Sequence, residues 1–218
     1  LQKPGAGRDA YDRLAADIST QTELPIVVEG LYRWIGFLPS RVNPRMPVHN
    51  QFVGLFDNGR MKVRGLEVRR SDAPLIVKQF QSEVLQRMGQ GQTIAELRMR
   101  IPEIEALTED YCRYLREGRA SIEEVAIGKT LTQAPEHYRH ATQTSIAAKE
   151  LQRRGVPVQP GETIHYVICQ SKAALPEDRV RAVAGGDGTI AYDIDAYVTL
   201  IQKAVSVLLV PLRMNCAR

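Results

Sequence analysis

Four basic side chains crowd into one short stretch, and they are the first candidates for chemistry. They lie within nine residues, at Lys62, Arg64, Arg69 and Arg70. Arginine presents a planar fork of N–H donors that matches phosphate oxygens, so the cluster suits contacts to successive phosphates of a nucleic acid. Gly65, inside the stretch, permits a close approach of the backbone. The alternative is a solvated surface on which Glu67 and Asp72 serve as ion-pair partners.

The acidic residues do not assemble an obvious catalytic site. Phosphoryl transfer with two metal ions needs carboxylates about 4 Å apart, and no convincing pair lies on a predicted strand. Asp193 and Asp195 flank a predicted helix start, where acids complement the helix dipole. The GGDG segment, 185–188, has neither a preceding strand nor a following Lys-Ser/Thr pair, so it is interpreted as a loop. Without analogy, the sequence contains no catalytic constellation.

Histidine and cysteine spacing predicts no metal site. His137 and His140 lack a suitable third ligand nearby. The three cysteines, Cys112, Cys169 and Cys216, are far apart and odd in number, so they imply no disulfide framework. A reducing cytosol, and hence a cytoplasmic location, is the simplest expectation.

Two further features leave alternatives open. Tyr32, Trp34 and Phe37 belong to one predicted strand and could stack nucleic-acid bases. A strand this apolar more often fills a core, which is the favoured interpretation. Lys129 follows another predicted strand and is a plausible phosphate contact, although it is a weak signal by itself.

The composition is that of an ordinary globular chain. Of the 218 residues, 44% are hydrophobic and 25% are charged, and the formal net charge is +4. This length can bury a substantial core, and the modest basic excess fits a nucleic-acid partner about as well as none. No uninterrupted apolar run reaches the roughly 18 residues that span a bilayer, so no membrane partner is expected.

The elements that must position these side chains follow from residue periodicity. Before residue 70 the pattern predicts, in chain order, a helix over 11–21, a strand over 26–39, a loop over 40–50 and a hairpin over 51–68. Asn58 and Gly59 are expected to supply the positive φ of the hairpin turn. Because side chains alternate along a strand, Lys62 and Arg64 should share one face of it.

The remainder is predicted to be mainly helical. Beyond residue 70 the pattern predicts helices over 75–88, 94–117, 142–154 and 194–212, the second of them interrupted at Pro102. It also predicts strands over 121–131 and 161–170, and a loop over 172–189. Ser71 or Asp72 should cap the first of these helices, with Pro74 in its first turn. The expected fold is α+β: an antiparallel hairpin segment of roughly 70 residues followed by a mainly helical region.

Taken in order, several segments resemble the C-terminal part of a family B DNA polymerase. The resemblance is carried by LPIVVEGLYRWIGFLPSR (24–41), NQFVGLFDNGRMKVRGLEVRRSDAP (50–74), SIEEVAIGKTL (121–131), IAAKELQRRGVPVQPGETIHYVIC (146–169) and YDIDAYVTLIQKAV (192–205). The first resembles the palm strand that follows the second catalytic aspartate motif. The second resembles the hairpin at the palm–thumb junction, and the others resemble thumb segments. The likeness covers nearly the whole chain.

The resemblance implies a role for individual residues. The resemblance implies contact with primer–template DNA at Arg64, Gly65, Arg69, Arg70, Lys129 and Tyr166. Lys62, from the basic stretch, is added to these candidate DNA-binding residues. Arg64 and Gly65 match the family's Lys-Gly or Arg-Gly dipeptide, whereas Lys129 and Tyr166 match thumb positions near the duplex backbone. Glu29 matches a carboxylate close to the metal site that is not one of its two principal ligands.

Three departures from the family shape the functional expectation. The motifs D-x-x-S-L-Y-P and D-T-D-S are both absent, and so are the fingers, the exonuclease and the N-terminal domain. The Lys-Lys-x-Tyr motif falls on 49–52 and reads H-N-Q-F, with Phe52 in place of tyrosine. The chain is therefore expected to supply the end of the palm (1–70) and the thumb (71–218). Catalysis would require Mg²⁺ and a large polymerase chain that carries the aspartates.

Other hypotheses stay open at this stage. The chain could be a split subunit, a cloned fragment or a degenerate relative. It could also be a non-catalytic nucleic-acid-binding or assembly module with a thumb-like fold, or a globular protein unrelated to nucleic acid. The DNA-contact hypothesis requires the basic side chains to face a shared concave surface rather than to be locked into acidic neighbours.

Overall fold

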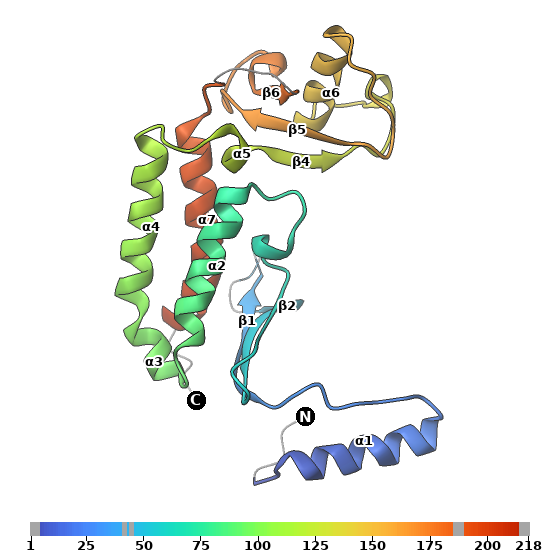
Figure 1. The fold of residues 1–218 in the computed structure, drawn as a ribbon, viewed down its shortest axis with the longest axis vertical. Helices are drawn as coiled ribbons and strands as arrows, with labels where there is room; N and C mark the ends of the chain where they lie inside the picture. The colour runs from blue at the N-terminus through green and yellow to red at the C-terminus, as the bar shows by residue number, and fades with distance from the viewer. Residues whose placement is uncertain (1–4, 41–42, 44–45, 185–189, 214–218) are drawn as a thin grey trace.

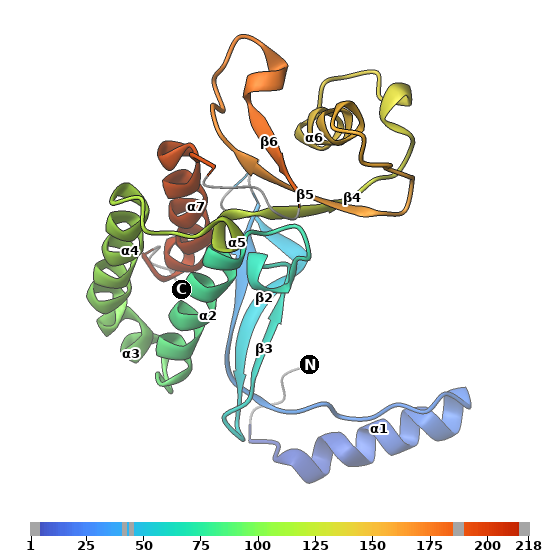
Figure 2. The same cartoon turned by 45° about the horizontal axis from the view of Figure 1, so that its top comes forward.

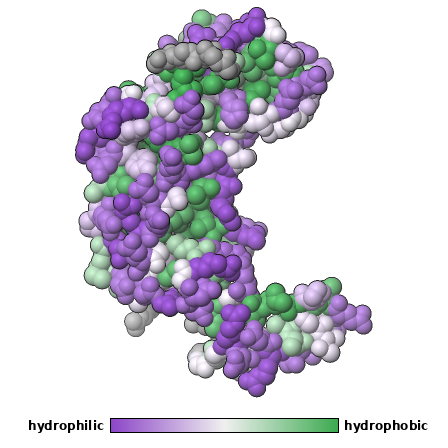
Figure 3. All heavy atoms as spheres, in the orientation of Figure 1, coloured by the Kyte–Doolittle hydropathy of each residue, from purple (hydrophilic) through white to green (hydrophobic). Residues whose placement is uncertain are grey.

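A computed structural model describes residues 5–40, 43, 46–184 and 190–213. The described chain bends around a hollow side (Figures 1 and 3). A layer of long helices lies along its back, a small sheet with a helix forms one end, and the first helix projects at the other end (Figure 1). Helices combine with two small antiparallel sheets, which confirms the α+β class. The GGDG segment and Cys216 lie outside the described residues.

The N-terminal elements are a helix and a three-stranded sheet. Their bounds are α1 Arg8–Thr22, β1 Tyr32–Pro39, β2 Pro47–Phe56 and β3 Met61–Arg64, and the sheet order is β1-β2-β3. β1 starts later than expected, because the segment before it runs back along α1. There the Ser19 hydroxyl accepts a hydrogen bond from the Ile26 amide at 2.9 Å. β2 starts at Pro47, inside the expected loop, because Pro39 pairs with Pro47 across the strands.

The hairpin between β2 and β3 forms as expected but turns differently. Gly59 has φ +82°, whereas Asn58 does not have a positive φ. The amide of Phe56 donates to the Arg60 carbonyl at 2.9 Å, which closes a three-residue loop. A glycine in the left-handed region at the third loop position is typical of such hairpins. The positive φ thus falls on Gly59 alone.

The helical layer carries most of the core. It contains the 3-10 helix η1 Glu67–Arg69 and the helices α2 Leu75–Gly89, α3 Ile94–Met99, α4 Ile101–Arg116 and α7 Ile194–Arg213. α2, α4 and α7 pack against one another, and α7 also contacts β1 (Figure 1). The centre of this layer is fully buried at Phe80, Ile104 and Ile201. The predicted helix over 94–117 is two helices, with Pro102 in the first turn of α4.

The start of α2 departs from the expected cap. The N-cap residue is Pro74, and no side chain caps the helix. A polar cap typically stabilises a helix by about 1 kcal/mol. Neither Ser71 nor Asp72 supplies it, because the chain turns through Pro74 in extended conformation and Asp72 binds cationic side chains instead.

The second sheet and its helix form the other end of the molecule (Figure 2). Its elements are α5 Ile122–Val125, β4 Ile127–Thr130, η2 Pro135–His137, α6 Gln143–Arg153, β5 Thr163–Ile168, η3 Pro176–Asp178 and β6 Val180–Val183, and the sheet order is β4-β5-β6. The first half of the predicted strand over 121–131 is helical, because Ser121 and Glu124 form a capping box. β6 lies in the expected loop; it has only four residues, too few to show a clear alternation.

α7 is both long and apolar. By length and composition alone it could cross a membrane, since an 18-residue window has a mean hydropathy of 1.4. The sequence did not predict this, because charged and polar residues interrupt the apolar run of α7. Tyr197, Ile201 and Leu208 are buried where α7 packs on α2 and α4. A core helix passes the same length and composition test, so this observation is weak support for a membrane span.

Candidate nucleic-acid interface

The basic stretch lies at the junction between the first sheet and the helical layer. It runs from β3 through Gly65 and η1 to the start of α2, beside the hollow side of the molecule (Figures 1 and 3). Gly65 has φ +72°, and a Cβ there would lie 2.5 Å from Gln51 Cγ and 3.2 Å from the Asn50 carbonyl oxygen. The close approach that this glycine permits is therefore one between the end of β3 and the middle of β2.

Lys62 is paired rather than open. On β3 it hydrogen-bonds the Glu29 carboxylate, and Arg60 lies 3.7 Å from the same group. The hydrogen bond from Lys62 holds the pKa of Glu29 below its ordinary value. Glu29 is thus surrounded by cations. Among the described residues, no group of three or more His, Cys, Asp or Glu side chains could hold a metal ion.

Arg70 and Lys129 share one carboxylate. Arg70 Nε and Nη2 donate to the two Asp72 oxygens at 2.9 and 3.0 Å. Lys129 Nζ, from β4, donates to Asp72 Oδ2 at 2.7 Å. The hydrogen bonds from Arg70 and, to a smaller extent, the one from Lys129 hold the pKa of Asp72 well below its usual range. The two predicted contact residues meet, although they lie on different elements, and Asp72 neutralises both.

Arg64 and Arg69 are exposed, and they differ from the other members of the cluster in their partners. Within the described parts of the chain, neither side chain has an ion-pair partner. Arg64 lies opposite Phe52 at the end of the β2–β3 ladder, and Arg69 ends η1. The structure therefore divides the four cluster residues and Lys129 into three cations held by carboxylates and two arginines with open donors.

A buried amide holds η1 in place. Gln81 of α2 is fully buried, and its Oε1 accepts the Val68 amide at 2.8 Å. Its Nε2 donates to Glu67 Oε2 at 2.9 Å and to the Ala204 carbonyl of α7 at 3.0 Å. Both polar atoms of the buried Gln81 amide therefore have hydrogen-bond partners, as buried polar groups normally do. Sequence reasoning missed Gln81, because a glutamine in an apolar helix carries no signal of its distant partners.

Tyr166 occupies a different environment from the arginines. Its side chain is buried on β5, with 4% of its surface exposed, and burial raises the pKa of its phenol. The hydroxyl lies 3.5 Å from Gln143 Oε1 of α6. Any contact that Tyr166 makes with DNA is therefore limited to the hydroxyl group, and its ring belongs to the second sheet's core.

The aromatic residues of β1 separate by face. Trp34 is buried and donates its indole N–H to the Gly91 carbonyl at 2.9 Å. Tyr32 stacks on Phe56 with ring centroids 4.3 Å apart. Phe37 is half exposed and packs at a tilt on Phe52. Trp34 is thus a core residue, and Phe37 stays available at the surface.

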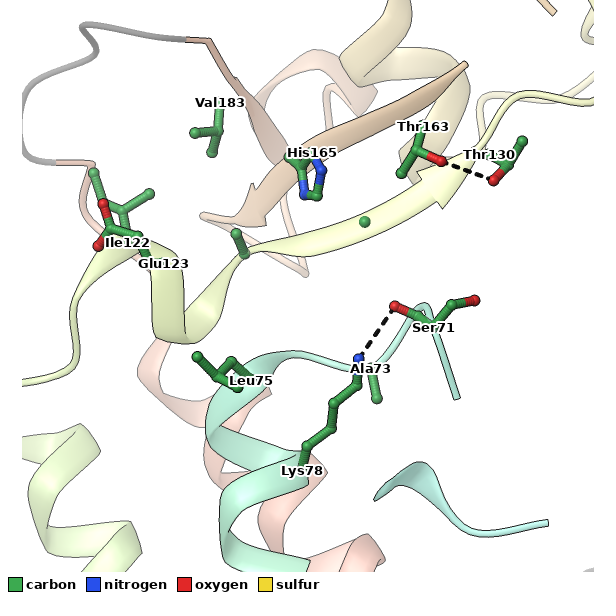
Figure 4. Close-up of a pocket in the computed structure, with 12 residues that line it drawn as sticks. Ser71, Ala73, Leu75, Lys78, Ile122, Glu123, Thr130, Thr163, His165 and Val183 are labelled. Atoms are coloured by element: carbon green, nitrogen blue, oxygen red, sulfur yellow. Dashed lines mark hydrogen bonds between the residues drawn. The ribbon is translucent and has the colours of Figure 1, made fainter. Parts of the chain in front are cut away.

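Two cavities flank the start of α2. One, of about 420 Å³, lies between α2 and the second sheet (Figure 4) and is bordered by Lys78, Thr130 and His165. The other, of about 670 Å³, is bordered by Arg70, Asp72 and Lys203. Both adjoin the loop that carries Asp72. His137 and His140 do not contribute to either cavity.

Comparison with known proteins identifies the family. The chain matches the sequence model of DNA polymerase family B over residues 49–212. It is 29% identical over 196 residues to the DNA polymerase of Archaeoglobus fulgidus, which covers 89% of this chain and 21% of that protein. It is 27% identical over 171 residues to DNA polymerase 2 of Aeropyrum pernix, covering 77% of this chain and 19% of that protein.

A solved structure supports the same fold. The family B DNA polymerase of Pyrobaculum calidifontis superposes on 94% of this chain with a TM-score of 0.62 and 23% sequence identity, and the match covers 25% of that polymerase. The chain belongs to DNA polymerase family B, as its resemblance implied. It spans about a fifth of the length of the two curated relatives described above.

Proposed function

We propose that this chain is the palm-end (1–70) and thumb (71–218) portion of a DNA-directed DNA polymerase that grips primer–template duplex through phosphate contacts. The observation that carries the proposal is the pair Arg64 and Arg69. Both are exposed, both lack a carboxylate partner within the described chain, and both belong to the segment that borders the hollow side. Phosphate contacts of this kind bind without sequence preference and weaken with salt.

Binding of a fluorescent primed duplex tests the proposal. The double variant Arg64→Ala/Arg69→Ala should bind about tenfold more weakly at low salt, with the slope of log K against log salt reduced by about 2. The matched control is Arg113→Ala/Arg116→Ala on α4, on the opposite side of the helical layer (Figure 1). Equal effects in the two variants, or no effect in the first, would overturn the proposal.

Catalysis is proposed to require the part of a polymerase that bears the catalytic aspartates. In a family B polymerase two divalent ions bind the triphosphate while the primer 3′-hydroxyl attacks its α-phosphorus. The described residues do not fit such a metal site, since Glu29 faces cations and no oxygen-ligand cluster surrounds it. Mg²⁺ is therefore proposed for the complete polymerase only. The cytoplasmic location stays a prediction.

Exposed apolar residues support the need for further polymerase structure. Among the residues that the structure describes, seven of the twelve large hydrophobic residues that are exposed lie between residues 14 and 46: Leu14, Leu24, Ile26, Val27, Ile35, Phe37 and Met46. Apolar surface gathers on the α1 end that faces the hollow (Figure 3). Concentrated apolar exposure is typical of an interaction surface. We propose that the aspartate-bearing part of the palm covers it.

A reconstitution experiment tests this requirement. The chain is mixed with a family B polymerase fragment that carries D-T-D-S, and primer extension is measured. The proposal expects extension well above that of the fragment alone. Extension that does not rise on addition of the chain, together with tight duplex binding by the chain alone, would favour a non-catalytic DNA-binding module instead.

A further inference from the structure

The Asp72 carboxylate occupies a position that a phosphate would fit. It accepts two hydrogen bonds from the fork of Arg70 and one from Lys129, all between 2.7 and 3.0 Å. Fork-like arginine donors and a lysine point charge are the groups that hold phosphate oxygens in proteins. Arg70 lies in the loop before α2 and Lys129 on β4, so the two cations are brought together from the helical layer and the second sheet.

The local sequence shows that Asp72 is committed to these cations. It lies three residues before α2, two positions ahead of the N-cap residue Pro74, and no side chain caps α2. Its side chain is 18% exposed, whereas those of Arg70 and Lys129 are 53% and 47% exposed. The carboxylate is therefore the enclosed member of the group, and both cations keep further N–H donors that can reach solvent.

There is room for the group to rearrange. The cavity of about 670 Å³ opens on Arg70 and Asp72. The cavity of about 420 Å³ opens on Ser71 and Thr130, the neighbours of Asp72 and Lys129. A side chain that leaves the ion pair can thus move into open space without displacing the core.

We propose that Asp72 is an internal substitute for a DNA phosphate: it fills the site formed by Arg70 and Lys129, and a backbone phosphate of the duplex displaces it. The inference rests on the proposed duplex-binding function and adds a competing group to it. While Asp72 is in place, two cations of the interface are neutralised. Duplex binding is then weaker, and less sensitive to salt, than the number of basic residues predicts.

The variant Asp72→Asn tests the proposal, because asparagine keeps the shape of the side chain and loses its charge. At low salt it should bind a primed duplex about three- to tenfold more tightly than the unmodified chain, with a salt slope steeper by one to two. The matched control is Asp17→Asn, which makes the same charge change on the exposed face of α1 and should leave binding within about twofold. Asp72→Ser, with circular dichroism as the check of folding, serves as a second variant.

A second measurement separates this proposal from the duplex-binding function. Inorganic phosphate is titrated while the Arg70 Nε–H resonance is followed by NMR, and Asp72→Asn should bind phosphate several-fold more tightly than either the unmodified chain or Asp17→Asn. If Asp72→Asn binds phosphate more tightly but no variant binds the duplex, the Asp72 proposal is supported and the proposed duplex-binding function is contradicted. Unchanged or weaker binding of both phosphate and duplex by Asp72→Asn and Asp72→Ser overturns the Asp72 proposal and leaves the function standing.

Discussion

The two three-stranded sheets of this chain have the same strand order and very different surroundings. The first sheet buries Trp34 and Leu55 against the helical layer, but Ile35 and Phe37 on the alternate positions of β1 stay exposed. The second sheet is covered by α6, and three successive residues of β5, from Tyr166 to Ile168, are buried. Consecutive burial means that both faces of the strand are covered at that end. The last four residues of β2 are buried in the same way, so the contrast between the two sheets rests on the exposed positions of β1.

The difference shows where exposed apolar surface is concentrated. Among the described residues, most of the exposed large hydrophobic side chains lie on α1, on β1 and in the segments beside them, whereas the second sheet and the helical layer expose fewer, such as Met99 and Leu175. Under the function proposed above, the aspartate-bearing part of the palm covers the first group. Substitutions at exposed apolar positions near the first sheet should therefore affect association, whereas substitutions at buried or sterically closed positions of either sheet should affect folding.

The largest expected effect is on association with the aspartate-bearing polymerase fragment. Val27 is 84% exposed, so Val27→Asp should leave the free energy of unfolding nearly unchanged. It should weaken association by about 100-fold, because a charge would be buried in an apolar contact. Leu175→Asp, at a residue 58% exposed beside the second sheet, is the matched change and should have little effect. Surface plasmon resonance against the fragment measures both.

The second effect concerns the closure of the second sheet onto the helical layer. The buried Tyr197 hydroxyl donates to the Val125 carbonyl at 2.8 Å and accepts the Ile168 amide at 3.0 Å. Tyr197→Phe leaves both backbone groups without a partner and should lower the free energy of unfolding by about 2 kcal/mol. The comparable Tyr32→Phe on the first sheet should cost less than about 0.5 kcal/mol. Equal urea midpoints for the two variants would contradict the contrast.

The third effect concerns the end of the first sheet. Gly65→Ala introduces a Cβ against the backbone of β2 at a positive φ, so the free energy of unfolding should fall by about 1–2 kcal/mol. Gly155 follows α6, has a similar φ of +77° and has open space around it. Gly155→Ala isolates the backbone strain and should cost about half as much. Thermal or urea unfolding of the two variants measures the difference.

The smallest effect is a pH dependence at the boundary between the two sheets. The pKa of Asp72 is lower in the folded chain than in the unfolded one, because Arg70 and Lys129 hydrogen-bond its charged form. Its contribution is therefore fully present above the unfolded pKa, near 4, and is lost as pH falls through the folded pKa. Since both cations are half exposed, the contribution should stay below about 1 kcal/mol. The difference in unfolding free energy between the unmodified chain and Asp72→Asn should be constant from pH 7 to 5 and shrink below pH 4.

Long periodic elements were predictable from the sequence, and short or paired features were not. α2, α6 and α7 show helical spacing over many residues, and the alternation around Gly59 predicted the β2–β3 hairpin. α5 was missed because four residues with a capping box lie inside a β-branched stretch. β6 was missed because it is only four residues long. Each of these local signals competes with a longer pattern that favours another structure.

The candidate site was predictable in its residue types but not in its pairings. The basic stretch and Lys129 were identified, whereas the Asp72–Lys129 contact joins residues 57 apart in the chain. The Glu29–Lys62 contact spans 33 residues. A sequence shows which side chains are charged, but only the fold decides which charges meet. The separation of Arg64 and Arg69 from their paired neighbours therefore required the structure.

The Gln81 amide joins three elements of the helical layer through one side chain. It accepts a hydrogen bond from η1 and donates to Glu67 of η1 and to the Ala204 carbonyl of α7, while it belongs itself to α2. Arg69, the last residue of η1, is positioned by the same contacts. Loss of this one amide would therefore loosen the junction between the first sheet and the helical layer at three hydrogen bonds at once.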